Sequence, residues 1–324
     1  MTETPPAQRA NNDSTPRCAQ ASLDAGEPAF ASAPAKTDLW LLLQHNGKWH
    51  SKTLDSLDEP ARGWIERFML DHPTARPQLI RRGNHDQPSA PGPEAPKTFF
   101  FVRSAEDQPT IWEFSFHDHA ELQSIDLAML AKNPQAMPEH RRHEPLYLVC
   151  THGKRDACCA RYGPAVYRAL GRDQGDQVWQ SSHIGGHRFA ATMLCFPHGH
   201  CFGRLDEAAA RRVAQRYAAD QLTDLVRYRG RTTYAEPVQA AEYFLRMATG
   251  VYGIDALHYS RGEIAGEERW RVCFVDRESD ETHELTIQRE VSSELANKSC
   301  GKGPEPVHRY LLVSHRQLGT GDAG

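Results

Sequence analysis

Short apolar runs alternate with helical patterns between residues 146 and 222, and this alternation constrains the fold more than any other feature of the chain. The run from Leu146 to Val149 predicts a buried strand that delivers Cys150 at its tip. The elements expected after it are a helix over 163–170, a strand over 178–182, a short helix, a hairpin of 193–196 with 201–205, and a helix capped by Asp206 that ends near Gln221.

This order of elements is that of a thioredoxin-like α/β fold, in which reactive groups lie where strands end and loops begin. The 324 residues are enough for two domains. The N-terminal unit has a similar order of elements, which leaves open that it is a degenerate copy of the thioredoxin-like domain. We expect a flexible tail over 1–37, an N-terminal α/β unit over 38–143, a thioredoxin-like domain over 144–222 and a C-terminal α+β extension over 223–324.

The balance of charge and hydrophobicity argues against several kinds of partner. The chain carries 38 Lys and Arg residues against 42 Asp and Glu residues, so no basic excess predicts nucleic-acid binding. No apolar stretch is long enough to cross a membrane, and the N-terminal segment lacks the apolar core of an export signal. We therefore expect a cytoplasmic protein with neither a membrane nor a nucleic acid as its partner.

Two segments single out four candidate metal ligands among the cysteines and histidines. Cys150 and Cys159 lie nine residues apart, and His183 and His187 lie four apart with two glycines between them. Thiolate and imidazole ligands together suit either zinc or an iron–sulfur cluster. A zinc protease would need a glutamate directly after the first histidine, where this chain has Ile184. Residue types and spacing alone leave zinc and iron–sulfur both open.

Three segments resemble the sucrase/ferredoxin-like family of thioredoxin-like ferredoxins. They are Cys-Thr-His-Gly-Lys-Arg-Asp-Ala-Cys-Cys-Ala from residue 150, Ser-His-Ile-Gly-Gly-His-Arg-Phe-Ala from residue 182, and Phe-Pro-His-Gly-His-Cys-Phe-Gly-Arg-Leu from residue 196. The resemblance is strongest over 146–222 and extends more weakly from the Cys18 region to Tyr310. It implies an α/β thioredoxin-like ferredoxin domain, flanked by the N-terminal α/β unit and the C-terminal α+β extension.

In that family two cysteines and two histidines bind a [2Fe-2S] cluster, which the resemblance places on Cys150, Cys159, His183 and His187. Cys159 is expected rather than Cys158, because the family's second cysteine lies nine residues after its first. Bis-histidine Rieske centres have reduction potentials of about −150 to +300 mV, against about −400 mV for plant-type ferredoxins. The resemblance therefore implies an electron carrier or redox sensor whose potential lies above that of an all-cysteine ferredoxin.

Two other functions stay open beside electron exchange with an unknown redox partner protein. The same four ligands would also suit a structural zinc module that serves interaction, and Cys158 would suit a thiol oxidoreductase, although the sequence has no Cys-x-x-Cys pair. Sucrose hydrolysis needs two carboxylates across a glycosidic bond, and no segment singles out such a pair. We expect a non-catalytic electron carrier rather than a hydrolase, with His152, His198 and His200 as solvated loop residues.

Overall fold

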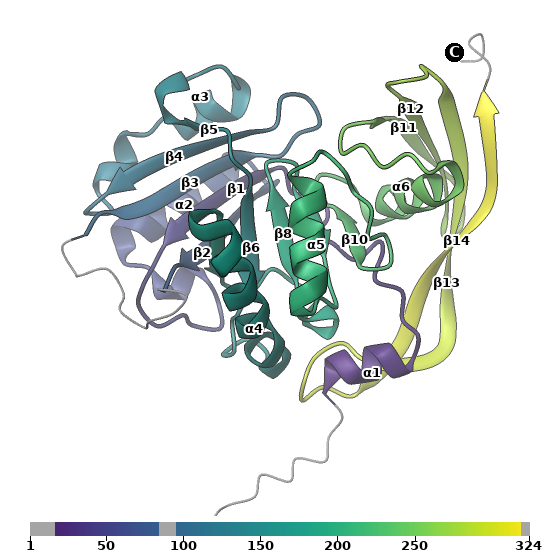
Figure 1. Ribbon diagram of the computed structural model, residues 1–324, viewed down its shortest axis with the longest axis horizontal. Helices are drawn as coiled ribbons and strands as arrows, with labels where there is room; N and C mark the ends of the chain where they lie inside the picture. Colours follow the sequence, from purple (N-terminus) through teal and green to yellow (C-terminus); the bar gives the residue numbers. More distant parts are fainter. Residues whose placement is uncertain (1–16, 84–94, 319–324) are drawn as a thin grey trace, which may run out of the picture.

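The computed structural model describes residues 17–83 and 95–318, which form two sheets with helices packed on them (Figure 1). The larger is a ten-stranded mixed sheet of β1 (Leu39–Gln44), β2 (Ala75–Arg81), β3 (Lys97–Arg103), β4 (Thr110–Phe116), β5 (Arg141–Arg142), β6 (Leu146–Cys150), β7 (Val178–Ser181), β8 (Met193–Phe196), β9 (His200–Phe202) and β10 (Tyr228–Arg231). The smaller is an antiparallel sheet of β11 (Leu257–Gly266), β12 (Arg269–Asp276), β13 (Thr282–Asn297) and β14 (Pro304–Leu318). The helices are α1 (Cys18–Asp24), α2 (Glu59–Asp71), α3 (Leu127–Lys132), α4 (Ala157–Gln174), α5 (Glu207–Tyr217) and α6 (Glu236–Thr249). The expected α/β fold class is confirmed.

The larger sheet contains the same arrangement of strands twice. In its first half, β1 and β2 are parallel and joined by α2, β3 pairs antiparallel with β1, and β4 pairs with β3. In its second half, β6 and β7 are parallel and joined by α4, β8 pairs antiparallel with β6, and β9 pairs with β8. The halves meet where β2 pairs with β7, so one sheet runs through both the N-terminal unit and the thioredoxin-like domain.

The larger sheet is curled, so that the inner faces of its halves pack against each other. Neighbouring strands lie about 4.8 Å apart, so β1 and β8, four places apart in the strand order, would be about 19 Å apart in a flat sheet. Instead, the rings of Trp40 on β1 and Phe196 on β8 have centroids 5.4 Å apart. The rings of Phe100 on β3 and Trp179 on β7 are 5.5 Å apart. The core between these inner faces includes Cys150 at the end of β6.

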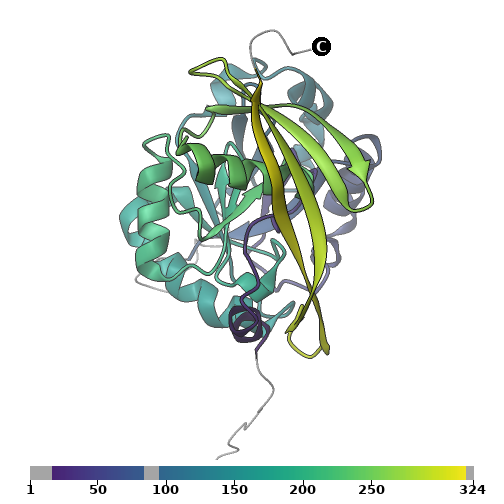
Figure 2. The ribbon, with the colours of Figure 1, turned by 90° about the vertical axis from the view of Figure 1, so that its right-hand side faces the viewer.

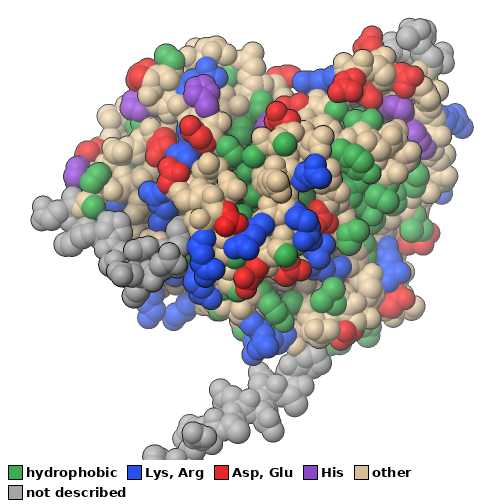
Figure 3. Space-filling view, viewed as in Figure 1, with side chains coloured by type: hydrophobic (Ala, Val, Ile, Leu, Met, Phe, Trp, Pro, Cys, Tyr) green, Lys and Arg blue, Asp and Glu red, His purple; other side chains and the backbone are tan. Residues whose placement is uncertain are grey.

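Each half of the sheet has its own helices on the outer face. α2 packs on the first half through Trp64 and Phe68, and α4 and α5 pack on the second half through Leu170 and Val213. Within residues 17–83 and 95–318, no helix is both long enough and apolar enough to cross a membrane. Exposed arginines on α4 and α5 are interspersed with acidic side chains (Figure 3), so this face is of mixed charge.

α4 begins six residues before the helix expected over 163–170. The side chain of Asp156 caps it by accepting a hydrogen bond of 2.8 Å from the Cys158 backbone N–H. Pro164 lies inside the helix rather than opening it, and the helix continues past Gly171 to Gln174. The prediction was wrong because packing of the helix on the sheet outweighs the backbone hydrogen bond that an internal proline removes.

The C-terminal extension forms a second layer in which α6 packs on the antiparallel sheet. Leu245 of α6, Phe274 of β12 and Leu285 of β13 belong to its core. β13 and β14 have 16 and 15 residues and continue beyond the rest of this sheet as a long hairpin (Figure 2). The tip of this hairpin lies beside α1 in both ribbon views. A strand was not predicted at β11, because most of its side chains are exposed and show no apolar alternation.

Residues 18–37 do not form the flexible tail that their composition predicts. Cys18, Ala19 and Ser22 of α1 are buried, and the Ala33 N–H donates a hydrogen bond of 3.2 Å to the side chain of Gln239. Ala and Pro lose almost no side-chain entropy on burial, so a segment rich in them packs as readily as it remains free. Residues 1–16 of the predicted tail lie outside the described residues.

Candidate metal centre

Cys150 is placed by β6, an inner strand of the second half. β6 lies between β7 and β8, and all of its residues are buried. Side chains alternate along a strand, so Tyr147 and Val149 face α4 and α5 while Leu148 and Cys150 face the inner core. The strand end therefore holds a cysteine that is only 1% exposed.

Cys159 is placed by the first turn of α4, which approaches the end of β6 very closely. A Cβ atom at Gly163 would lie 2.0 Å from the Cys150 carbonyl oxygen, so only glycine permits this approach. The approach places Cys159, itself 1% exposed, beside the histidine loop. Its Sγ lies 4.0 Å from Nδ1 of His183.

Cys158 faces away from this position although it is the neighbour of Cys159 in the sequence. Its Sγ lies 3.5 Å from that of Cys18 and 3.4 Å from that of Cys300. The Cys18 thiol donates its hydrogen to Cys158, which lowers the pKa of Cys158 to about 6 against the opposing effect of burial. The two adjacent cysteines therefore belong to two different groups of side chains.

Two glycines and two arginines shape the loop that carries the histidines. Gly185 and Gly186 have φ angles of +113° and +64°, which other residues adopt only with strain. Arg229 donates a hydrogen bond of 3.0 Å to the Gly185 carbonyl, and Arg76 donates one of 2.7 Å to the Ile184 carbonyl. A Cβ atom at Gly186 would lie 2.1 Å from the Arg229 guanidinium. The two glycines and the hydrogen bonds from the two arginines therefore fix the backbone conformation of this loop.

Cys150, Cys159 and His183 form a compact group of possible metal ligands. Their ligand atoms all lie within 4.8 Å of one another, with both cysteines buried and the histidine partly exposed. His187 is not part of this group, but its Nδ1 lies 3.3 Å from Nε2 of His183. Its Nε2 lies 3.6 Å from an Asp156 oxygen and has no hydrogen-bond partner among the described residues. The structure therefore brings three predicted ligands together and places the fourth directly beyond His183.

The two cysteines of this group differ in acidity. The pKa of Cys150 is lowered well below its usual value because the Cys159 thiol donates to it and His183 lies beside it. The pKa of Cys159 is raised by donation of its own hydrogen to Cys150 and by burial. One anionic sulfur is favoured here, and the thiolate is the form of cysteine that binds metals.

Arg229 and Arg76 add positive charge beneath the group. Arg229 is 1% exposed, and among the residues that the structure describes neither arginine has a carboxylate within ion-pair distance. Burial lowers the pKa of both, that of Arg76 to about 10, while the sulfurs of Cys201 and Cys150 act in the opposite direction. Buried cations without carboxylate partners favour negative charge nearby.

His152 is buried rather than solvated, so that prediction was wrong. Its side chain is 2% exposed, and its Nδ1 accepts a hydrogen bond of 3.2 Å from the His183 backbone N–H. Its ring also packs edge-on against Trp49, with centroids 5.7 Å apart. His152 therefore supports the backbone of a predicted ligand.

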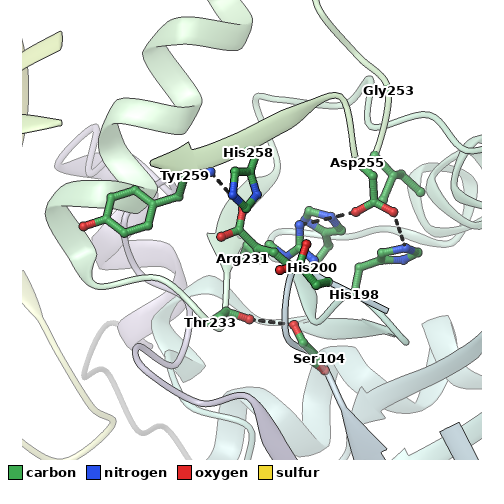
Figure 4. Close-up of polar contacts among 12 residues, drawn as sticks. Ser104, His198, His200, Arg231, Thr233, Gly253, Asp255, His258 and Tyr259 are labelled. Atoms are coloured by element: carbon green, nitrogen blue, oxygen red, sulfur yellow. Dashed lines mark hydrogen bonds and ion pairs between the residues drawn. The ribbon is translucent and has the colours of Figure 1, made fainter. Parts of the chain in front are cut away.

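His198 and His200 belong to a separate polar network between β9, β10 and the start of β11 (Figure 4). Asp255 joins Nε2 of His198 at 3.1 Å to Arg231 at 3.5 Å. His200 is fully buried, and its Nδ1 lies 2.9 Å from the Tyr228 hydroxyl. The prediction of a solvated His200 was wrong, because the C-terminal extension covers this hairpin.

These features define an α/β protein with a thioredoxin-like arrangement of strands and cysteine and histidine groups that could hold a metal. Comparison with known families shows which one: the sucrase/ferredoxin-like family model matches residues 31–230, and the chain belongs to this family. The match covers more than half of the chain, includes both halves of the larger sheet and leaves Cys18 and Cys300 outside. No curated protein and no solved structure matches the chain.

Proposed function

We propose that the chain is an electron-transfer or redox-sensing protein that binds a [2Fe-2S] cluster through Cys150, Cys159, His183 and His187. The observation that carries the proposal is the group of two buried sulfurs and the His183 imidazole within 4.8 Å of one another, with His187 next to it. Two thiolates and two imidazoles also form the ligand set of Rieske [2Fe-2S] centres. When bound, such a cluster supplies one-electron transfer.

The residues present fit this group in chemistry and in burial. The two sulfurs lie on the inner side of the site, where the curled core excludes water. Nδ1 of His187 lies 3.3 Å from Nε2 of His183, so it is the ring nitrogen that faces this group as a possible fourth ligand atom. Both histidines lie in a loop whose carbonyls Arg76 and Arg229 hold, so the rings are positioned before anything binds.

Arg76 and Arg229 have a further role in this proposal. An electron added at the site increases its negative charge, and the two guanidinium groups beneath the loop stabilise that charge. They therefore act in the same direction as the neutral imidazoles and favour reduction. The expected reduction potential lies above that of a site with four cysteines.

The histidine side of the site is where a redox partner protein would approach. The His187 side chain is 12% exposed, whereas Cys150 and Cys159 are each 1% exposed, so the imidazoles lie nearer the surface. The cytoplasm is the compartment we expect, because thiolate ligands persist in a reducing environment.

A structural zinc site at the same position is the second candidate. The specific observation in its favour is that Cys150, Cys159 and His183 converge within 4.8 Å while His187 lies outside that group. A single ion held by these three residues, with the neighbouring His187 as its fourth ligand, would make a closed four-coordinate site. Such a site would serve folding or interaction rather than electron transfer.

Metal analysis of protein purified without oxygen separates the two candidates. The proposal expects about two iron and two sulfide ions per chain and a paramagnetic signal after one-electron reduction. Cys159→Ala should remove the iron, whereas Cys158→Ala, a matched change at the adjacent residue, should retain it. Zinc without iron at this site would support the second candidate and overturn the first.

A further inference from the structure

A second group of possible metal ligands lies beside the first and takes its members from three distant parts of the chain. Cys18 comes from α1, Cys158 from the first turn of α4, and Cys300 from the tip of the β13–β14 hairpin, and Asp156 completes the group. Figures 1 and 2 both show α1 against the hairpin tip. Cys18 and Cys158 are completely buried, and Cys300 is partly exposed.

The three sulfur atoms form an almost equilateral triangle. Their separations are 3.5 Å for Cys18 and Cys158, 3.4 Å for Cys158 and Cys300, and 3.5 Å for Cys300 and Cys18. A tetrahedral zinc ion with bonds of about 2.3 Å holds its sulfur ligands about 3.8 Å apart. The side chains would need to move by only a few tenths of an ångström, whereas a disulfide would use two of the sulfurs and leave the third unexplained.

Asp156 is held in position to be the fourth ligand. Its Oδ1 lies 3.7 Å from the Cys18 Sγ, close to the separation of about 3.5 Å between sulfur and oxygen ligands of one tetrahedral zinc ion. Backbone N–H groups of Cys158 and Cys300 donate to its two oxygens at 2.8 and 3.0 Å. The carboxylate is therefore fixed against the triangle of sulfurs.

We propose that Cys18, Cys158, Cys300 and Asp156 bind one zinc ion at a site separate from the ligands of the proposed cluster. Zinc favours thiolate-rich, four-coordinate sites, and four protein ligands make a closed, structural site. Binding replaces the hydrogens of the three thiols, which leave as protons. The ion ties the N-terminal helix and the C-terminal hairpin to α4.

This site lies partly outside the residues that the family model matches. Cys18 and Cys300 fall outside the matched residues 31–230, so two of the three sulfurs belong to segments beyond the matched region. Asp156 also lies 3.6 Å from Nε2 of His187, so its carboxylate stands between the zinc site and a proposed cluster ligand. A metal-bound carboxylate that faces a ligating histidine would fix the orientation of that ring.

Zinc and iron measured separately on the full chain test the proposal. Wild-type protein should contain about one zinc ion per chain in addition to any iron. Cys18→Ala and Cys300→Ala should each lose the zinc and keep the iron content of the wild type. Cys273→Ala, a buried cysteine of β12 outside both groups, is the matched control and should keep both metals.

A second measurement does not depend on whether the variants fold. Cobalt(II) added to zinc-depleted wild-type protein should give the intense thiolate-to-metal absorption and visible bands of a tetrahedral site, and zinc should displace it. Zinc that persists in Cys18→Ala, or that disappears only when Cys150 is replaced, would overturn the proposal. So would wild-type protein without a cobalt signal, or a disulfide between two of the three cysteines found by thiol mapping.

Discussion

The two halves of the larger sheet have the same topology but carry different residues at their strand ends. β1 ends on Gln44, whose side-chain oxygen accepts a hydrogen bond of 2.9 Å from the Thr98 backbone N–H. β6 ends on Cys150, which faces the inner core beside Cys159 and His183. One half thus uses its strand end to bond the neighbouring strand β3, and the other uses it to gather possible metal ligands.

The helices that follow these strands show the same contrast. Asp58 caps α2 and Asp156 caps α4, so the two helices begin in the same way. The second and third residues of α2 are Pro60 and Ala61, whereas those of α4 are two cysteines. The comparison teaches that the shared topology sets where the strand end and the first turn of the helix lie. The few residues at those places then decide whether a half can bind a metal.

Replacing the strand-end residue in each half should give the largest difference. Cys150→Ala removes a proposed ligand, and we expect its iron content to fall at least tenfold, because a cluster with three ligands is readily lost. Gln44→Ala, the corresponding change in the first half, should keep the wild-type iron content. Equal iron loss in both variants would break the comparison, since the first half would then matter as much as the second.

Replacing a proposed histidine ligand by cysteine should give the next largest effect, on the reduction potential of the second half. His183→Cys adds a negative thiolate in place of a neutral imidazole, so we expect the reduction potential to fall by on the order of 100 mV, or about 2.3 kcal/mol for one electron. Potentiometric titration followed by the reduced-state paramagnetic signal measures this shift. A potential equal to that of the wild type would contradict the role given to His183.

Because α4 approaches β6 so closely, we expect two glycine-to-alanine substitutions, one in each half, to change the free energy of unfolding in opposite directions. Gly163→Ala puts a Cβ atom 2.0 Å from the Cys150 carbonyl oxygen, and we expect it to reduce the free energy of unfolding by about 1–3 kcal/mol. Gly63→Ala in α2 meets only the end of Arg67 at 3.8 Å, and should add about 0.5–1 kcal/mol through helix propensity. Urea denaturation of both variants measures the difference, and equal effects would contradict the close packing.

A buried histidine should make the stability of the second half depend on pH. Burial and the nearby charge of Arg231 lower the pKa of His200 well below its usual value, so the folded chain keeps it neutral. The unfolded chain takes up a proton near pH 6.5, so folded-state stability falls as the pH drops below that value, by up to about 1.4 kcal/mol per pH unit. His200→Gln removes this proton uptake and should flatten the dependence between about pH 6.5 and 5. Urea denaturation at several pH values checks this, and an unchanged slope would count against it.

The parts of the fold that were predictable from sequence are the buried strands, which show up as continuous apolar runs. Such runs indicated β6 and β8 correctly, because both strands are buried on both faces of a curled sheet. The start of α4 was missed, since Gly163 and Pro164 give a break signal that packing overrides. Sequence periodicity does not record how closely a helix approaches its strand.

The candidate site was predictable to the extent that its ligands are close together in sequence. Spacing and resemblance singled out Cys150, Cys159, His183 and His187, and the structure brings the first three together. The group around Cys158 was not foreseen, because its thiols meet only through the hairpin pairing and the placement of α1. A tail-like composition before residue 38 also hid the role of α1.

The sequence separation of the sulfurs at the hairpin tip has a consequence for synthesis of the chain. Cys18 and Cys300 are 282 residues apart. At about 5–20 residues per second, the ribosome needs roughly 15–60 seconds to make the chain between them. During that interval the Cys18 thiol is present while its last sulfur neighbour does not yet exist. The nascent chain therefore passes through a period in which this thiol is open to oxidants and chaperones, and the period ends only when the final hairpin has been translated.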